Sequence, residues 1–272
     1  MAAGAGAVAV RRARPSAAVR LYARYEPVVL GAAGVVLLFV LWEAAGALGV
    51  IDPRLFGQPS RLVPAAAGLW GAGVLQHHVS VTLTEFALGF TLAVLVGIPM
   101  GFLMGWYRGV EYVLEPFVWF LYSSPLVAFY PLFIVWFGIG MPTVVTIAFL
   151  LAVFPLLINT VTGVQHVEAA LVRAARSFGA RDLEIFLKVS LPASLPIVFA
   201  GLRLAVGRAL VGVVVGEIFG ATAGLGFAVR YWGGRLRIPE VFVFLTCIAL
   251  LGVVLTQLIR LLEGRLLRWR HE

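Results

Sequence analysis

Five charged side chains stand inside long apolar stretches of the sequence; one of them is Glu217, and the other four are candidate site residues. Glu43 and Glu85 supply carboxylates, and Arg203 and Arg208 supply guanidinium groups. A charged group inside a bilayer costs several kcal/mol unless it is paired or hydrated. Two explanations stay open. These residues line a polar path in which arginine attracts an anionic or zwitterionic solute, or they form a structural ion pair or snorkel to the interface.

The sequence offers little other chemistry. A phosphate-binding loop needs a Gly-rich backbone followed by Lys-Ser or Lys-Thr, but the one lysine, Lys188, stands between Leu187 and Val189. The histidines His77 and His78 are adjacent and cannot share one helix face as metal ligands. We therefore expect no catalytic residue, no metal site and no cofactor within this chain.

The composition is that of a membrane protein. Of 272 residues, 61% are hydrophobic and 12% are charged, whereas about 25% of residues are charged in soluble domains. The mean hydropathy is +1.00. The net charge of +8 is interpreted as a topology signal and not as nucleic-acid binding, because basic residues collect on the cytoplasmic side. The predicted fold class is all-α, a polytopic protein in a lipid bilayer.

Six stretches reach the ~20 apolar residues that a membrane-spanning helix needs. They run at about Val28–Val50, Val79–Trp106, Pro116–Phe137, Pro142–Gly163, Ser194–Phe219 and Val241–Ile259. The third contains Pro125 and Pro131, which predict a kink. A rise of ~1.5 Å per residue places Arg208 and Glu85 at a similar depth. We therefore predict that these two side chains pair, with Glu43 as the alternative partner.

Charge and proline content divide the rest of the chain. Residues 1–27 form a basic cytoplasmic tail, 28–50 a first transmembrane helix, and 51–78 an extracytoplasmic loop with a possible amphipathic helix. Residues 79–262 form a five-helix core that includes a basic loop at 165–192, and 263–272 form a cytoplasmic tail. With both termini inside, fourteen Lys and Arg residues lie inside and five outside. The Gly-rich segment Gly220–Pro239 is expected to be an irregular or re-entrant loop.

The basic loop carries the most informative motif. It reads Arg173-Ala174-Ala175, three residues, Gly179, nine residues, then Val189-Ser190-Leu191-Pro192. This spacing resembles the coupling loop of ABC importer permeases, in which Glu-Ala-Ala precedes the Gly. The family's Glu falls on Arg173 here, because the triplet Glu168-Ala169-Ala170 is out of register with Gly179.

Other segments extend the resemblance from about Val50 to Arg268. They are Leu132-Phe133-Ile134-Val135-Trp136-Phe137-Gly138-Ile139-Gly140, Gly201-Leu202-Arg203-Leu204-Ala205, and Gly216-Glu217-Ile218-Phe219 with Gly224-Leu225-Gly226. They are similar to the permeases of nitrate, sulfonate and taurine importers, a branch that also serves pyrimidine and riboflavin-type substrates.

The resemblance implies a type I ABC importer transmembrane domain in the bacterial inner membrane. It implies that two copies of a separate ATPase, which binds ATP-Mg, dock on the loop. The ATPase-coupling positions carried over are Arg173, Ala174, Ala175, Gly179, Leu191 and Pro192. A substrate-binding protein outside and a second copy of this chain complete the expected partners. The alternative is a secondary active transporter that uses the intramembrane charges; the loop motif and the lack of a visible internal repeat argue against it.

Overall fold

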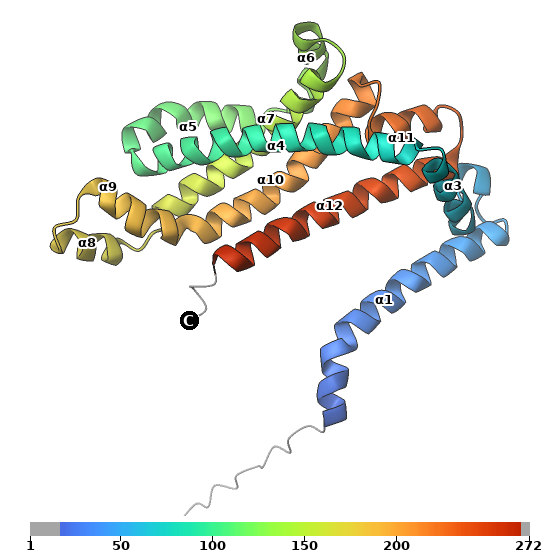
Figure 1. The fold of residues 1–272 in the computed structure, drawn as a ribbon, viewed down its shortest axis with the longest axis horizontal. Helices are drawn as coiled ribbons and strands as arrows, with labels where there is room; N and C mark the ends of the chain where they lie inside the picture. Colours follow the sequence, from blue (N-terminus) through green and yellow to red (C-terminus); the bar gives the residue numbers. More distant parts are fainter. Residues whose placement is uncertain (1–16, 268–272) are drawn as a thin grey trace, which may run out of the picture. The chain divides into compact units, whose positions relative to one another are not determined.

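The computed structural model describes residues 17–267, which contain helices and turns and no strand (Figure 1). The chain divides into two compact units, Met1–Ser60 and Arg61–Glu272, which are described separately. The first unit holds α1 (Ala17–Ala47), α2 (Pro53–Phe56) and the start of α3 (Pro59–Gly71). The second unit holds the rest of α3, then α4 (Val74–Trp106), α5 (Arg108–Ser123), η1 (Leu126–Phe129), α6 (Tyr130–Phe137), α7 (Met141–Gln165), α8 (Ala169–Ser177), α9 (Asp182–Ile185), η2 (Phe186–Ser190), α10 (Leu191–Gly220), α11 (Leu225–Gly233) and α12 (Ile238–Leu266).

The apolar helices confirm the predicted fold class. Five helical stretches are long and apolar enough to cross a membrane: Val29–Ala47, Val74–Trp106, Met141–Gln165, Asp182–Gly220 and Ile238–Leu266. A bent pair, Arg108–Ser123 with Leu126–Phe137, makes a sixth when it is counted as one span. Helix α1 begins at Ala17, within the predicted tail, and residues 1–16 and 268–272 of the predicted tails lie outside the described residues.

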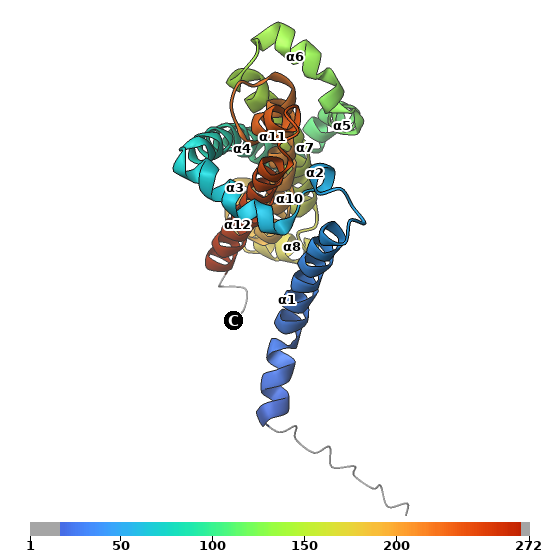
Figure 2. The same cartoon turned by 90° about the vertical axis from the view of Figure 1, so that its right-hand side faces the viewer.

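Helix α7 forms the centre of the second unit and packs against α4 and α10 (Figures 1 and 2). Small residues recur every fourth position on the side of α4 that faces α7: Gly89, Ala93, Gly97, Gly101 and Gly105. A Cβ at Gly101 would lie 2.5 Å from the Cβ of Thr160, and one at Gly212 of α10 would lie 2.8 Å from the Cα of Ala148. Close approach through small residues is the usual way in which membrane helices pack.

The third span is bent where the kink was predicted. Helices α5 and η1–α6 meet at 81°. The break lies at Ser124 and Pro125, because proline cannot donate the backbone hydrogen bond that would continue α5. Pro131 lies in the first turn of α6, where a missing N–H costs nothing. Pro125 is therefore the proline that breaks the span.

The segment Gly220–Pro239 is more regular than predicted. It contains α11, whose residues Leu225 and Ala228 are fully buried. Helix α11 packs against α12, α10 and α4. The glycine content suggested an irregular loop, but the apolar face of this short helix is covered by three neighbours, so tertiary packing stabilises it.

The basic loop folds into two short helices that lie at the end of the bundle opposite α11 (Figure 1). Helix α8 has no buried residue. Gly179 has φ +80° between α8 and α9, a conformation that favours glycine. Helix α9 continues through the wide π turn η2 into α10 without an intervening loop. We refer below to the α8–α9 end and the α11 end of this unit.

Candidate functional site

The basic loop presents an exposed surface at the α8–α9 end. Arg173 and Ala174 are exposed on α8, Ala175 is half-buried, and Phe178 is 91% exposed. A hollow of about 270 Å³ lies between the two short helices. Its lining consists of Ala175, Phe178, Gly179, Ala180, Glu184, Ile185, Lys188 and Val189. Phe178 therefore adds exposed apolar area beside this hollow.

The structure brings only some of the motif positions together. Ala175 and Gly179 line the same hollow. Leu191 and Pro192 are half-buried in the first turn of α10 and do not line it. The loop's ion pairs, Arg176 with Asp182 at 3.4 Å and Lys188 with Glu184 at 3.6 Å, are exposed and contribute little to stability.

Arg208 lies beside the break in the third span. It lines a cavity of about 230 Å³ together with Tyr122, Ser124, Pro125, Leu126, Val127, Leu150, Leu151 and Phe154. Its side chain is exposed and forms no ion pair with any residue in the range 17–267. The arrangement therefore places an uncompensated guanidinium next to interrupted helix backbone.

Arg203, five residues earlier on α10, has a different environment. Its guanidinium donates to the carboxylate of Glu263 on α12 and forms a salt bridge with it. The two side chains are 31% and 23% exposed. Of the two arginines in this helix, Arg203 is neutralised by Glu263, whereas Arg208 has no such partner within residues 17–267.

The predicted ion pair between Arg208 and Glu85 is wrong. Glu85 is 2% exposed and its carboxyl group meets that of Glu217, which is fully buried. Glu217 follows Arg208 by nine residues, which is about 14 Å along α10 and two and a half turns around it. Arg208 thus lies on the opposite face of α10 from the residue that Glu85 contacts.

Glu43 also has a structural partner. Its carboxylate accepts hydrogen bonds from the backbone N–H of Ser60 at 3.0 Å and from the Ser60 hydroxyl at 2.8 Å. Ser60 lies in the first turn of α3, where free backbone N–H groups favour an acidic side chain. This contact satisfies the carboxylate within the first unit.

Glu217 is the centre of a buried cluster at the α11 end that the sequence reasoning missed. Its carboxylate accepts from the Thr82 hydroxyl at 2.5 Å and from the Gly226 N–H at 2.6 Å. The Leu225 N–H donates to the Thr82 hydroxyl at 2.8 Å, and the Gly224 N–H donates to His78 Nδ1 at 3.1 Å. Side chains of α4 and α10 thus cap the first turn of α11, which has no side-chain cap of its own.

A signal for this cluster is present in the sequence. His78, Thr82 and Glu85 are spaced by four and three residues and therefore lie on one face of α4. Polar residues on one face of a membrane helix indicate a polar partner on a neighbouring helix. Glu217 and the glycines that follow it supply that partner.

Comparison with known proteins identifies the kind of protein to which this geometry belongs. Residues 93–268 match the family described as "Binding-protein-dependent transport system inner membrane component". The riboflavin transport system permease protein RibX of Chloroflexus aurantiacus is 34% identical, over 94% of this chain and 96% of the relative. The taurine transport system permease protein TauC of Escherichia coli is 30% identical, over 90% of this chain and 91% of the relative.

A solved structure shares the fold. A chain of the MetNI methionine ABC transporter, in an inward-facing conformation, superposes with a TM-score of 0.57 and 22% sequence identity. The match covers 71% of this chain and 94% of that chain. The family match, the full-length relatives and the shared fold lead to one conclusion. The chain belongs to the family of binding-protein-dependent transport system inner membrane components, the membrane-spanning permeases of ABC importers.

Proposed function

We propose that this permease forms one half of a path for a small anionic or zwitterionic solute, and that Arg208 lines it. The observation that carries the proposal is the uncompensated Arg208 beside the break at Ser124 and Pro125. An arginine inside a membrane protein faces water, a partner or a ligand, because exposure to lipid costs several kcal/mol. Arg203 shows how the same helix neutralises an arginine for structural purposes.

The break adds a second attraction for an anion. Where a helix stops inside a membrane protein, its free backbone groups must face a polar cavity or another part of the protein. Ser124 and the backbone after it lie in the same cavity as the guanidinium. A relative named for taurine, which carries a sulfonate anion, agrees with this preference.

Arg208→Gln, Arg208→Lys and a control, Arg235→Gln, test the path. The permease is reconstituted in proteoliposomes with its ATPase and binding protein, and uptake of labelled taurine is measured. We expect Arg208→Gln to lower uptake about tenfold or more, because a charge-assisted hydrogen bond is lost. Lysine keeps the charge but not the planar fork, so partial recovery is expected. Wild-type uptake by Arg208→Gln would show that this arginine does not line the solute path.

The basic loop is the proposed docking site of a separate ATPase, which would bind ATP-Mg and hydrolyse ATP for a chain that is itself no enzyme. The exposed α8, the turn at Gly179 and the hollow beside Ala175 support this role. One permease lines only half a path, so we propose a pair of identical copies with two ATPase copies. A substrate-binding protein delivers the solute from outside.

The proposed topology places both termini on the ATPase side. This topology puts fourteen Lys and Arg residues on the ATPase side and five on the outer side, and basic residues collect on the cytoplasmic side. Single cysteines at Arg61 and Arg268, introduced after replacement of Cys247, should react with an impermeant reagent from opposite sides of the membrane. Arg268 lies outside the described residues. Reaction of both cysteines in intact cells would refute the six-span topology.

A further inference from the structure

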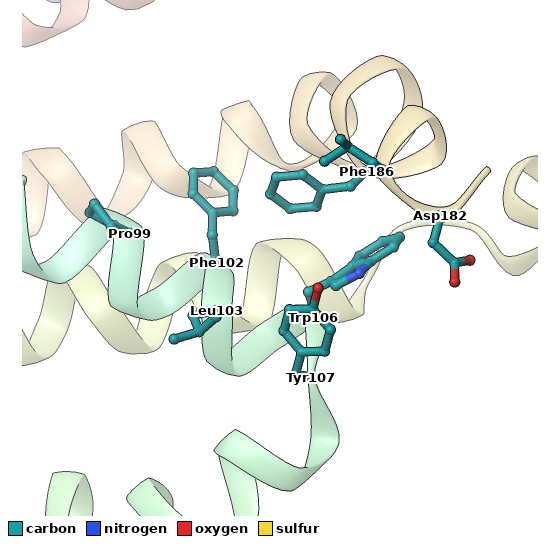
Figure 3. Close-up of a pocket in the computed structure, with 8 residues that line it drawn as sticks. Pro99, Phe102, Leu103, Trp106, Tyr107, Asp182 and Phe186 are labelled. Carbon is teal, nitrogen blue, oxygen red and sulfur yellow. The ribbon is translucent and has the colours of Figure 1, made fainter. Parts of the chain in front are cut away.

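A second groove lies at the α8–α9 end, apart from the hollow beside Ala175. It has a volume of about 290 Å³, close to the lower limit for ligand pockets. One wall is the end of α4 and the other is α9 with the first residue of the π turn. The lining residues are Pro99, Phe102, Leu103, Trp106, Tyr107, Asp182, Leu183 and Phe186 (Figure 3).

The groove is apolar and aromatic. Figure 3 shows Phe102 and Trp106 of α4 directed toward Phe186, whose ring lies edge-on to both, with centroids 5.7 and 5.1 Å away. Leu103 is 43% exposed and Leu183 is 67% exposed, so the groove is open on its outer side. Its α4 wall is part of a membrane span, so the medium outside that wall is the bilayer.

The position along the span is that of a membrane interface. Trp106 and Tyr107 end α4, and tryptophan and tyrosine concentrate at the level of lipid headgroups. The groove therefore extends from the headgroup level toward the hydrocarbon, along Leu103 and Pro99. An acyl chain that enters it from the adjacent leaflet would lie along α4.

Two basic residues flank the mouth. Arg108 directly follows Tyr107, and Arg181 directly precedes Asp182. Both are exposed, and neither forms an ion pair with another residue of the range 17–267. The one carboxylate in the lining, Asp182, is already bound to Arg176. The mouth therefore carries positive charge at the level where lipid phosphates lie, which attracts an anionic headgroup.

We propose that this groove binds an anionic phospholipid of the leaflet on the α8–α9 side. Its acyl chain occupies the aromatic groove, and its phosphate interacts with Arg108 and Arg181. The lipid would contact Leu183 and Phe186, so it would touch α9 and the start of the π turn directly. A bound lipid would thus contact the basic loop without entering the hollow beside Ala175.

Native mass spectrometry of the assembled permease and ATPase tests the binding. The complex is purified with equal amounts of phosphatidylglycerol and phosphatidylcholine, and the retained lipids are counted. The double variant Arg108→Gln/Arg181→Gln should lose phosphatidylglycerol roughly 30-fold, which corresponds to about 2 kcal/mol for two basic residues near an anionic surface. The matched control Arg260→Gln/Arg265→Gln changes two exposed arginines on α12 and should retain it.

A second pair of variants tests the acyl-chain part. Leu183→Trp fills the groove and should lower retention of both lipids, whereas Leu187→Trp, half-exposed outside the groove, should not. A photo-crosslinking amino acid at position 103 should give lipid adducts in the intact complex. Adducts to the ATPase or to a second permease, or unchanged lipid retention in Leu183→Trp and in the double arginine variant, would overturn the proposal. None of these readouts depends on which solute is transported.

Discussion

The two ends of α10 differ in how their polar groups are satisfied. At the α11 end, Glu217 is fully buried and binds the Thr82 hydroxyl and the Gly226 N–H. At the α8–α9 end, the ion pairs of Arg176 with Asp182 and of Lys188 with Glu184 are exposed to solvent. Buried hydrogen-bond networks fix one arrangement, whereas exposed pairs do not. Contacts within the chain therefore hold the α11 end in one arrangement, whereas the α8–α9 end is an exposed surface, which suits the docking proposed for it.

Substitutions at the two ends should therefore have different consequences. A change at the α11 end removes contacts that the chain makes with itself, so it should lower the stability of the isolated permease. A change on the exposed face of α8 removes no internal contact, so it should act only in the assembled transporter. The arginines repeat the contrast inside the helix, since Arg203 has an internal partner and Arg208 has none among the described residues.

The largest loss of stability is expected for Glu217→Ala. The substitution leaves buried donors of Thr82 and Gly226 without an acceptor, at a cost of about 1–3 kcal/mol for each. Glu217→Gln keeps an acceptor oxygen and should cost less. Thermal unfolding of the purified permease in detergent measures both, with exposed Glu115→Ala as the control. Equal unfolding midpoints for Glu217→Ala and the control would show that the hydrogen bonds of Glu217 do not stabilise the α11 end.

A smaller loss is expected where α10 crosses α7. Gly212→Val would place a side chain against the Ala148 backbone, which cannot move aside as a flexible side chain can. Overpacking of this kind costs about 1–3 kcal/mol. Gly207→Val on the same helix meets no atom within 4 Å and carries the same cost in helix propensity. Unfolding midpoints that do not separate these two variants would contradict the packing of α7 against α10.

A still smaller effect is expected for the ion pair between Arg203 and Glu263. Both side chains are partly exposed, so solvent weakens their attraction. A double-mutant cycle with Arg203→Ala and Glu263→Ala should give a coupling of about 1 kcal/mol in unfolding free energy. Strictly additive single effects would show that the pair contributes nothing to the packing of α10 against α12.

The smallest effect on stability is expected for Ala175→Trp. The side chain is half-buried beside an open hollow, so the isolated permease should unfold at the wild-type temperature. In the assembled transporter the indole should block docking, so uptake and uptake-linked ATP hydrolysis should fall together. Ala170→Trp, on the exposed first turn of the same helix and outside the hollow, is the control for a bulky side chain. Normal uptake by Ala175→Trp would show that the ATPase does not dock on the hollow beside Ala175.

Much of the architecture could be predicted because it depends on local composition. The lengths of the apolar runs predicted the spans, Pro125 predicted the bend, and the glycine at position 179 marks the turn between α8 and α9. The stripe of small residues from Gly89 to Gly105 was also readable, at intervals of four, as the face of α4 that meets a neighbour.

The side-chain partners could not be predicted from depth alone. Counting residues gave Arg208 and Glu85 similar depths but ignored the direction in which each side chain points around its helix. Nine residues of α10 separate Arg208 from Glu217, and half a turn remains after two full turns. Helix α11 was missed for a related reason. Its stability comes from caps and neighbours on α4 and α10, which no short window of sequence contains.

The unbroken helical path from α9 through the π turn to the end of α10 is longer than a bilayer is thick. This path covers Asp182–Gly220, 39 residues, which corresponds to a length of about 58 Å at the α-helical rise. A bilayer with its headgroups is about 40–45 Å thick. A path of this length that crosses the membrane extends beyond it by a dozen ångströms or more. The Asp182 end of this path can therefore lie at the headgroup level, with helix α8 beyond it, where a soluble protein can bind that helix.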